Sequence, residues 1–569
     1  MDFYLIHAPS VYDFRKRSLL YGPISDVVPS TPVFEMYPLG FVSLMGYLER
    51  HGYRVKIINL AVKMLKDPSF NAESLIKKLY PLAFGIDLHW LVHAQGALEV
   101  AKIIKRHHPD TPIILGGLSA TYYHEEVMAN HPEVDFIVRG DSAEQPLYNL
   151  LKSIEKGMEP LEVPNLTWRD KQGTIKVNPL SYVPEDLNDY SLNYEVIVKS
   201  VLREADLESN LPFKSWAEYP YTAVITCKGC IYNCVTCGGS RYAYERFFNR
   251  PRPVFKDPAK LIEELRIIGS YVKAPTFILG DLRMAGDTYV ESFIRLLKRE
   301  RIDNPMVFEL FTIASERFLK ELLSATSELY MEISPESHDE EVRCLQGRFF
   351  TNQQLEKMIE KALTIGVKRL DVFFMIGLRK QNLTSTLKTV EYCDHLLEKY
   401  GKEDLLHPFI APLAPFLDPG SLAFENPSNY GYSVSSKSFE HHRRLLEGLT
   451  WKHYLNYETT WLSKEELVEA TYQSSAALTL VKLKHGLLSR KEAEELIDRI
   501  KLNRQILRKL DQILSEIAPD QQPLTLEGLR SELQKANEPL LCLKEELRPP
   551  FKARLKPLSI LKLLLRRIF

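Results

Sequence analysis

The feature that most limits how this 569-residue chain can fold is an alternation of short apolar runs with amphipathic stretches of helix length. In the first 190 residues the helix-like stretches include 41–49 and 94–107. Alternation of this kind predicts an α/β domain in which helices cover both faces of a mostly parallel sheet, the Rossmann-like or doubly wound arrangement. The expected strands are residues 3–7, 55–60, 82–86, 113–115 and 136–138.

Glycine and polar residues follow two of these expected strands. Gly116, Gly117 and Ser119 come after the fourth, and Gly140 and Asp141 come after the fifth. Ligands of doubly wound sheets bind at the carboxyl ends of the strands, where glycine lets the backbone approach a flat or phosphorylated ligand. These residues predict a ligand crevice, although a double glycine is also common in ordinary tight turns. Beyond the domain we expect a β-hairpin at residues 166–177 and a linker at 179–192.

A dense group of thiols follows the apolar run 221–226. Four of the seven cysteines lie between Cys227 and Cys237. Cys230, Cys234 and Cys237 have the spacing C-x3-C-x2-C, which allows three thiolates to ligate one compact iron–sulfur cluster and leaves a fourth metal position open.

Zinc sites, four-cysteine electron-transfer clusters and disulfides are the other structures that clustered cysteines can form. Structural zinc sites usually separate their CxxC halves by about 12–20 residues, and here only three residues intervene. An electron-transfer cluster that also uses Cys227 remains an alternative, because C-x2-C-x3-C-x2-C resembles ferredoxin spacings. A disulfide framework is disfavoured by the sparse cysteines and by an N-terminus that lacks a charged leader.

Composition indicates a globular protein of the reducing cytoplasm. The chain has 73 basic and 74 acidic residues, so no overall field favours nucleic acid as a partner. No apolar run approaches the length of a membrane-spanning helix.

The cysteine loop resembles that of the radical SAM family. The resemblance implies that Cys230, Cys234 and Cys237 hold a [4Fe-4S] cluster, that S-adenosylmethionine (SAM) binds its open iron, and that the loop follows the first strand of a partial (β/α)6 barrel. Cys227 lies outside the family triad and is expected to be a nearby buried thiol. The family often has an aromatic residue just before the last cysteine, where this chain has Thr236.

The resemblance also places SAM contacts at the ends of later barrel strands. Glu332 is expected on a buried strand, where an unpaired carboxylate is costly and calls for a ligand or a basic partner. Ser337 is expected to cap a helix or to contact SAM. The residues that fall where the family contacts SAM are Gly280, Asp281, Glu332, Ser334, Glu336 and Gly377.

The order of motifs upstream of the cysteines resembles the cobalamin-binding radical SAM subclass, in which a Rossmann-like N-terminal domain holds cobalamin over the barrel mouth. His89 is expected to be a loop histidine near the crevice, since members of the subclass generally lack a lower axial histidine. The resemblance covers roughly residues 1–430. It assigns cobalamin contacts to Leu39, Gly40, Gly116, Gly117, Ser119, Gly140, Asp141 and Glu144.

Four segments are therefore predicted. Residues 1–190 form the cobalamin-binding domain with a β-rich connector, and 191–432 form the radical SAM barrel. Residues 433–550 form a C-terminal helical domain without strands. Residues 551–569 form a basic tail whose helix could lie on a membrane surface or pack on the body.

The resemblance implies reductive cleavage of SAM to a 5'-deoxyadenosyl radical, with a flavodoxin or ferredoxin as electron donor. Methylation of an unactivated carbon is the expected reaction, on a small molecule or, if the tail binds membranes, on a lipid or isoprenoid. A cyclase or rearrangement enzyme with the same cofactors, and a cobalamin or iron–sulfur carrier or sensor, are the alternatives.

Overall fold

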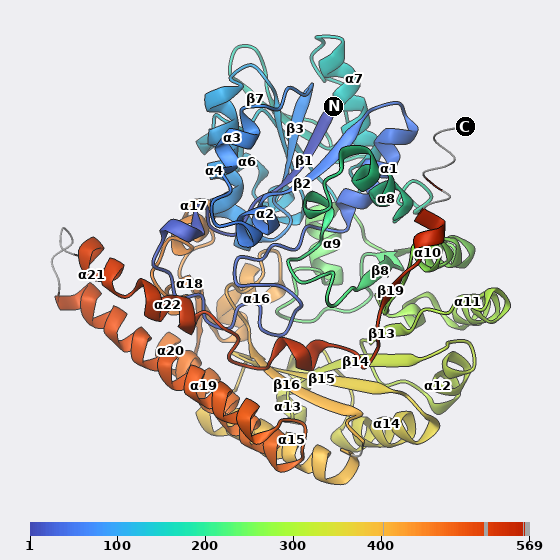
Figure 1. Ribbon diagram of the computed structural model, residues 1–569, viewed down its shortest axis with the longest axis vertical. Coiled ribbons are helices and arrows are strands. Elements are labelled where there is room, and N and C mark those ends of the chain that lie inside the picture. The colour runs from blue at the N-terminus through green and yellow to red at the C-terminus, as the bar shows by residue number, and fades with distance from the viewer. Residues whose placement is uncertain (402, 517–521, 561–562, 564–569) are drawn as a thin grey trace.

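The computed structural model describes residues 1–401, 403–516, 522–560 and 563. Figure 1 shows an N-terminal α/β domain, a second α/β unit beside it, and long C-terminal helices along one flank. The α/β fold class with a helical C-terminal region is the one that the sequence predicts.

The N-terminal sheet has the strand order β2-β1-β3-β4-β5-β6-β7. Its first five strands are parallel, and β6 (Leu166–Arg169) and β7 (Ile175–Val177) add the predicted hairpin in antiparallel pairing. The topology reverses between β1 and β3, where doubly wound sheets open their ligand crevice. The parallel strands are β1 (Phe3–His7), β2 (Val55–Asn59), β3 (Ala83–Asp87), β4 (Ile113–Gly116) and β5 (Phe136–Val138).

Helices cover both faces of this sheet. Apolar residues of α1 (Gly40–Arg50) and α7 (Glu144–Glu155) pack on one face. On the other face lie α3 (Ala72–Ile76), α4 (Ala94–His107) and α6 (His124–Asn130). The predicted doubly wound domain is confirmed.

The second unit is a six-stranded parallel sheet of order β16-β15-β14-β13-β12-β8. Its end strands do not pair with each other, as expected for a partial barrel. The strands are β8 (Thr222–Ile225), β12 (Thr276–Leu279), β13 (Met306–Leu310), β14 (Leu329–Glu336), β15 (Arg369–Ile376) and β16 (Leu406–Pro412). The apolar run 329–333 predicts one of these strands, and β14 continues three residues beyond it.

Helices connect these strands around the outside of the barrel. α10 begins with Pro258 at its first turn after the N-cap Asp257, and α14 begins with a capping box of Thr351 and Gln354. The connecting helices are α10 (Pro258–Tyr271), α11 (Asp287–Glu300), α12 (Glu316–Leu323), α14 (Asn352–Ile365) and α15 (Leu383–Tyr400).

The C-terminal region contains the two expected long helices, α19 (Lys464–Lys484) and α20 (Arg490–Glu516). The expectation that it has no strands is wrong. β17 (Tyr432–Val434) pairs with β18 (Tyr457–Thr459) in antiparallel fashion. Each strand has three residues, too few for a periodic pattern, and Tyr432 is held by its hydroxyl, which donates to Gly377 O.

The chain then crosses the barrel, from α22 (Arg530–Ala536) at one side to β19 (Arg554–Leu555), which pairs with β11 (Val272–Lys273) beside α10 (Figure 1). Arg369, at the start of β15, donates to Arg548 O at 2.9 Å, so the crossing segment lies against the amino ends of the barrel strands. The predicted amphipathic helix after Pro557 falls mostly outside the described residues. Among the described residues, no helix is long and apolar enough to cross a membrane.

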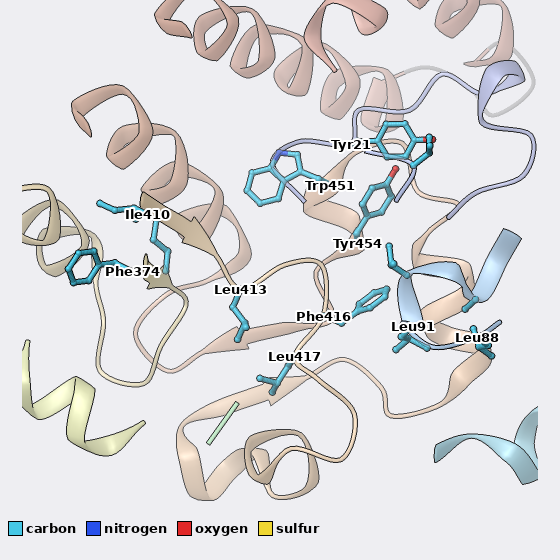
Figure 2. Close-up of a cluster of buried hydrophobic side chains, with 14 of the residues drawn as sticks. Tyr21, Leu88, Leu91, Phe374, Ile410, Leu413, Phe416, Leu417, Trp451 and Tyr454 are labelled. Atoms are coloured by element: carbon cyan, nitrogen blue, oxygen red, sulfur yellow. The ribbon is translucent and has the colours of Figure 1, made fainter. Parts of the chain in front are cut away.

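One buried apolar cluster joins the three regions. Figure 2 shows Leu88 and Leu91 of the N-terminal domain near Phe416, which follows β16, while Trp451 and Tyr454 of the C-terminal region lie above them. This shared core fixes the carboxyl ends of β1, β3, β4 and β5 relative to the barrel mouth.

Candidate active site

The cysteine loop begins where β8 ends. β9 (Cys227–Lys228) pairs with β10 (Val254–Phe255), and the chain then passes through the triad to α9 (Arg241–Phe248). The backbone amide of Tyr232 donates to Cys230 Sγ at 3.4 Å, and the amide of Gly239 donates to Cys237 Sγ at 3.3 Å. Amide hydrogen bonds to cysteine sulfurs stabilise thiolate ligands and help to set the potential of an iron–sulfur cluster.

The three thiols of the triad must lose their protons when an iron–sulfur cluster binds to them. Burial raises the pKa of Cys230 and Cys234, so both are thiols at neutral pH until iron binds. Within the described part of the chain, no three His, Cys, Asp or Glu side chains are grouped to hold a single metal ion. A cubane spreads its ligands over a larger volume than a single ion does.

Cys227 has a different environment from the triad. Its Sγ lies 3.8 Å from Gly229 O and packs against Gly280, where an added Cβ would be 3.1 Å from the sulfur. Burial raises the pKa of Cys227 to about 12. Its close packing on Gly280 suits a structural thiol.

Glu332 and Ser334 alternate along β14 with the buried apolar residues Met331 and Ile333. Alternation in a strand sends these two side chains toward the barrel interior. A register shift between Ile333 and Glu336 interrupts the alternation before Glu336. Glu332 lies on the strand, as predicted, and Ser334 and Glu336 also lie within it, whereas the sequence placed those two after it.

The acidic side chains of neighbouring strands lie in register. Glu332 is paired with Glu309 of β13 and with Asp371 of β15. Arg369 Nε donates to Asp371 Oδ1 at 2.7 Å, and the amide of Gly280 donates to Glu309 Oε2 at 2.7 Å. Burial, together with Glu309 and Asp371, raises the pKa of Glu332 well above its ordinary value.

Arg348 was not found by sequence reasoning. It pairs with Glu336 at 3.1 Å and donates to Phe311 O at 2.7 Å. Its neighbour Gly347 packs so closely on the cysteine loop that an added Cβ would lie 3.4 Å from Cys234 Cα. Arg348 therefore brings a cation to the side of the triad.

The other predicted SAM residues make contacts within the protein. Asp281 receives hydrogen bonds from Arg283 and from the amide of Phe311, so its carboxylate is saturated. Gly377 has φ +99°, and an added Cβ would lie 2.2 Å from the hydroxyl oxygen of Tyr457. Gly377 thus permits the C-terminal region to pack closely on the barrel mouth.

The expected helix cap at Ser337 is wrong. The helix is α13 (Glu340–Leu345), and Asp339 is its N-cap, with Oδ1 accepting from the amides of Glu341 and Val342. Ser337 is fully buried, and its hydroxyl accepts from the amide of Asp339. The extension of β14 moves the helix start two residues further along the chain.

In the N-terminal domain the predicted crevice residues gather at the carboxyl ends of the strands. An added Cβ would meet nothing within 4 Å at Gly40 and only Val138 O, at 3.8 Å, at Gly116. These glycines leave space for a ligand to approach the backbone, which fits a large flat cofactor. Leu39 is the N-cap of α1, next to Gly40.

Other predicted cobalamin contacts make hydrogen bonds or close packing contacts within the domain. Ser119 Oγ donates to His89 O at 3.0 Å, and Glu144 Oε1 accepts from Ser43 Oγ at 2.8 Å. Gly117 has φ +115°, and an added Cβ would lie 2.5 Å from His89 Cα. Gly117 therefore lets the loop after β4 pack on the loop after β3.

Two histidines and an aspartate lie under this crevice. His7 Nδ1 and Asp87 Oδ1 are 2.9 Å apart, and His93 Nε2 lies 2.8 Å from Phe34 O. Burial lowers the pKa of His93 to about 4, so its ring is neutral at pH 7. His89 is half-buried in the loop after β3, close to the crevice, as the sequence predicts.

The two sets of loops meet at the segment after β5. Lys228, in the cysteine loop, donates from Nζ to Ser142 Oγ at 3.1 Å. Arg250 binds Asp141 through two hydrogen bonds, of which Nη2 to Oδ1 is 3.0 Å. Lys228 and Arg250 were also missed by sequence reasoning, since their partners lie 86 and 109 residues away.

Comparison with known proteins agrees with this arrangement. A "B12 binding domain" family model matches residues 26–149, and a "Radical SAM superfamily" model matches residues 224–393. The fold resembles that of the cobalamin-dependent SAM radical enzyme OxsB, with a TM-score of 0.57 at 13% identity over 100% of this chain and 80% of that one. It also resembles the radical SAM methyltransferase TsrM from Kitasatospora setae, with a TM-score of 0.56 at 12% identity over 91% of this chain and 100% of that one.

Sequence relatives include two kinds of enzyme. An uncharacterized methyltransferase of Pyrococcus horikoshii is 24% identical over 73% of this chain and 81% of its own length. The anaerobic magnesium-protoporphyrin IX monomethyl ester cyclase of Rubrivivax gelatinosus is 24% identical over 46% of this chain. The match spans 45% of that cyclase, about half of its length.

Fold and site together define a cobalamin-binding domain joined to a radical SAM barrel. The chain belongs to the cobalamin-dependent radical SAM enzymes, and its cofactors are a [4Fe-4S] cluster, SAM and cobalamin. The roles of individual residues toward these cofactors remain predictions.

Proposed function

We propose that the protein is a cobalamin-dependent radical SAM methyltransferase that acts on an unactivated carbon. The observation that carries the proposal is the direct contact between the cysteine loop and the loop after β5, Lys228 to Ser142. Two cofactors whose binding loops touch can act on one substrate atom, whereas a carrier or sensor has no need of that proximity. When bound, the cluster and SAM supply hydrogen abstraction, and cobalamin supplies the methyl group.

The protein's own residues position the reactants and exclude water. Cys230, Cys234 and Cys237 would hold the cluster, with the amides of Tyr232 and Gly239 directed at its ligand sulfurs. Glu332 and Ser334, which face the barrel interior, could bind the ammonium group or the ribose hydroxyls of SAM. Hydrogen bonds to such charged groups are stronger than those between neutral groups.

The second candidate is a radical cyclase or rearrangement enzyme with the same cofactors, because a cyclase is among the relatives. The test is an anaerobic assay with methyl-labelled SAM, reductant and cobalamin. Label in the product supports methylation, and a product that forms without label contradicts it. Absence of SAM cleavage in protein with a full cluster would support the carrier or sensor.

Two partners complete the proposal. A flavodoxin or ferredoxin should deliver the electrons. The substrate should be a small molecule, and a lipid is one candidate. The basic tail motivates the lipid candidate. Flotation of the full chain with anionic liposomes, compared with a chain ending before Phe551, tests it: equal flotation removes the argument for a lipid.

A further inference from the structure

The junction between the cysteine loop and the N-terminal domain contains buried charges to which no cofactor role has been assigned. The side chains of Arg250 and Asp141 are each 4% exposed or less, and Arg250 Nη1 also donates to Pro184 O at 3.0 Å in the connector. Arg250 therefore ties the barrel both to the loop after β5 and to the connector.

Lys228 makes the second tie. It is 8% exposed, and its Nζ lies 3.1 Å from Ser142 Oγ and 3.9 Å from the centroid of the Tyr190 ring. Among the described residues no carboxylate forms an ion pair with it. A hydroxyl and an aromatic face contact the ammonium, and the carboxylates of Asp141 and Glu144 attract it from beyond ion-pair distance. The groups that offset its charge therefore lie across the junction.

Lys228 lies close to the cysteine triad, so its contacts link the cluster loop to the N-terminal domain. Lys228 is two residues from Cys230, and its backbone is fixed by pairing with Val254 of β10. Ser142 belongs to residues 139–143, the loop between β5 and α7 at the carboxyl edge of the sheet. The ammonium thus bridges the loop that holds the cluster and a loop that borders the cobalamin crevice.

We propose that Lys228 and Arg250 are positioning residues that set the distance between the cluster and cobalamin. Two contacts together form a clamp that holds the cysteine loop against the loop after β5. One joins Lys228 to Ser142 near the triad, and the other joins Arg250 to Asp141. The inference rests on both cofactors serving one reaction, as proposed above. It also gives Asp141 a role in the domain junction, since both of its carboxylate oxygens bind Arg250.

The chain offers a matched control in the same buried region. Lys256 is 1% exposed, its Nζ lies 2.6 and 2.8 Å from the carboxylate oxygens of Glu264, and it is 5.0 Å from the Tyr190 ring centroid. Both partners of this ion pair belong to the barrel. The double change Lys256→Met with Glu264→Gln removes a buried pair of similar size without touching the loop after β5.

The experiment measures the separation of the two cofactors directly. Holoenzyme with a reduced cluster and cob(II)alamin is examined by pulsed electron paramagnetic resonance, which reports the distribution of distances between the two spin centres. We expect a narrow distribution for the wild type and for Lys256→Met/Glu264→Gln. Lys228→Met should broaden it at unchanged iron and cobalamin content, and Lys228→Arg should partly restore it.

Activity gives a second readout. Lys228→Met should raise the amount of SAM cleaved per product formed several-fold, because the radical would form with cobalamin misplaced. If Lys228→Met does not fold, Ser142→Ala removes only the hydroxyl partner and should broaden the distribution less. A wild-type distribution in Lys228→Met or in Ser142→Ala, or equal broadening in the control, overturns the clamp. The distance distribution could respond as expected in an enzyme that transfers no methyl group. That result would support the clamp and contradict the proposed methyltransferase function.

Discussion

The predicted cobalamin crevice and the barrel interior contain opposite kinds of buried ionisable side chain. Under the crevice lies fully buried His93, whose pKa burial lowers to about 4. Inside the barrel lies a row of carboxylates, Glu309, Glu332 and Asp371, whose pKa burial raises in each case. Burial thus favours the uncharged form of His93 and of these carboxyl groups.

The two regions should therefore respond to pH with opposite signs. His93 has a folded-state pKa below its ordinary 6.5, so its contribution to stability is present above pH 6.5 and is lost as the pH falls toward 4. Glu332 has a folded-state pKa above its ordinary 4.5, so its contribution is present below that pH and is lost as the pH rises. Acid should weaken the crevice first, and alkali should weaken the barrel first.

The largest expected effect separates the two regions by cofactor. Cys234→Ala removes one cluster ligand, so iron content and SAM cleavage should fall to background while cobalamin binding persists. Iron analysis, SAM cleavage under reductant and the cobalamin absorption spectrum measure the three quantities.

Cys227→Ala is the matched control for the cysteine prediction. Because Cys227 packs on Gly280 and lies outside the predicted triad, the variant should keep the cluster and most SAM cleavage. Loss of the cluster in this variant would show that Cys227 seals the fourth iron position, which is incompatible with radical chemistry.

A smaller effect is expected at the crevice. Gly117→Ala puts a Cβ 2.5 Å from His89 Cα at a φ of +115°, so it should cost about 2–4 kcal/mol of unfolding free energy and weaken cobalamin binding. The neighbouring Gly116→Ala has no contact closer than 3.8 Å, so it should fold normally. Thermal unfolding and cobalamin titration compare the two, and equal losses would contradict the packing argument.

The difference between the regions also shows what the sequence can predict. Strands such as residues 3–7 and 113–115 were found to within a residue, because an apolar run bounded by turn residues records burial locally. The end of β14 was missed because Ser334, Pro335 and Glu336 look like a loop in the sequence, and a register shift between Ile333 and Glu336 interrupts the alternation there. Lys228 and Arg250 were missed because their contacts are with Ser142 and Asp141, residues of another domain.

The smallest effect tests the carboxylate row inside the barrel. Glu332→Gln keeps the shape of the side chain but cannot ionise, so it should stabilise the protein by on the order of 1 kcal/mol as the pH rises from about 5 to 8. Glu360→Gln, on the exposed side of α14, should show no such trend. Denaturant unfolding at several pH values measures both.

The same variant also tests the role of Glu332 toward SAM. If the carboxylate binds the SAM ammonium, its loss in Glu332→Gln should raise the dissociation constant for SAM. A stability gain without a change in SAM affinity would mean that Glu332 serves the barrel interior alone, with Ser334 and the Glu336–Arg348 pair left as the contacts of β14 nearest the cluster.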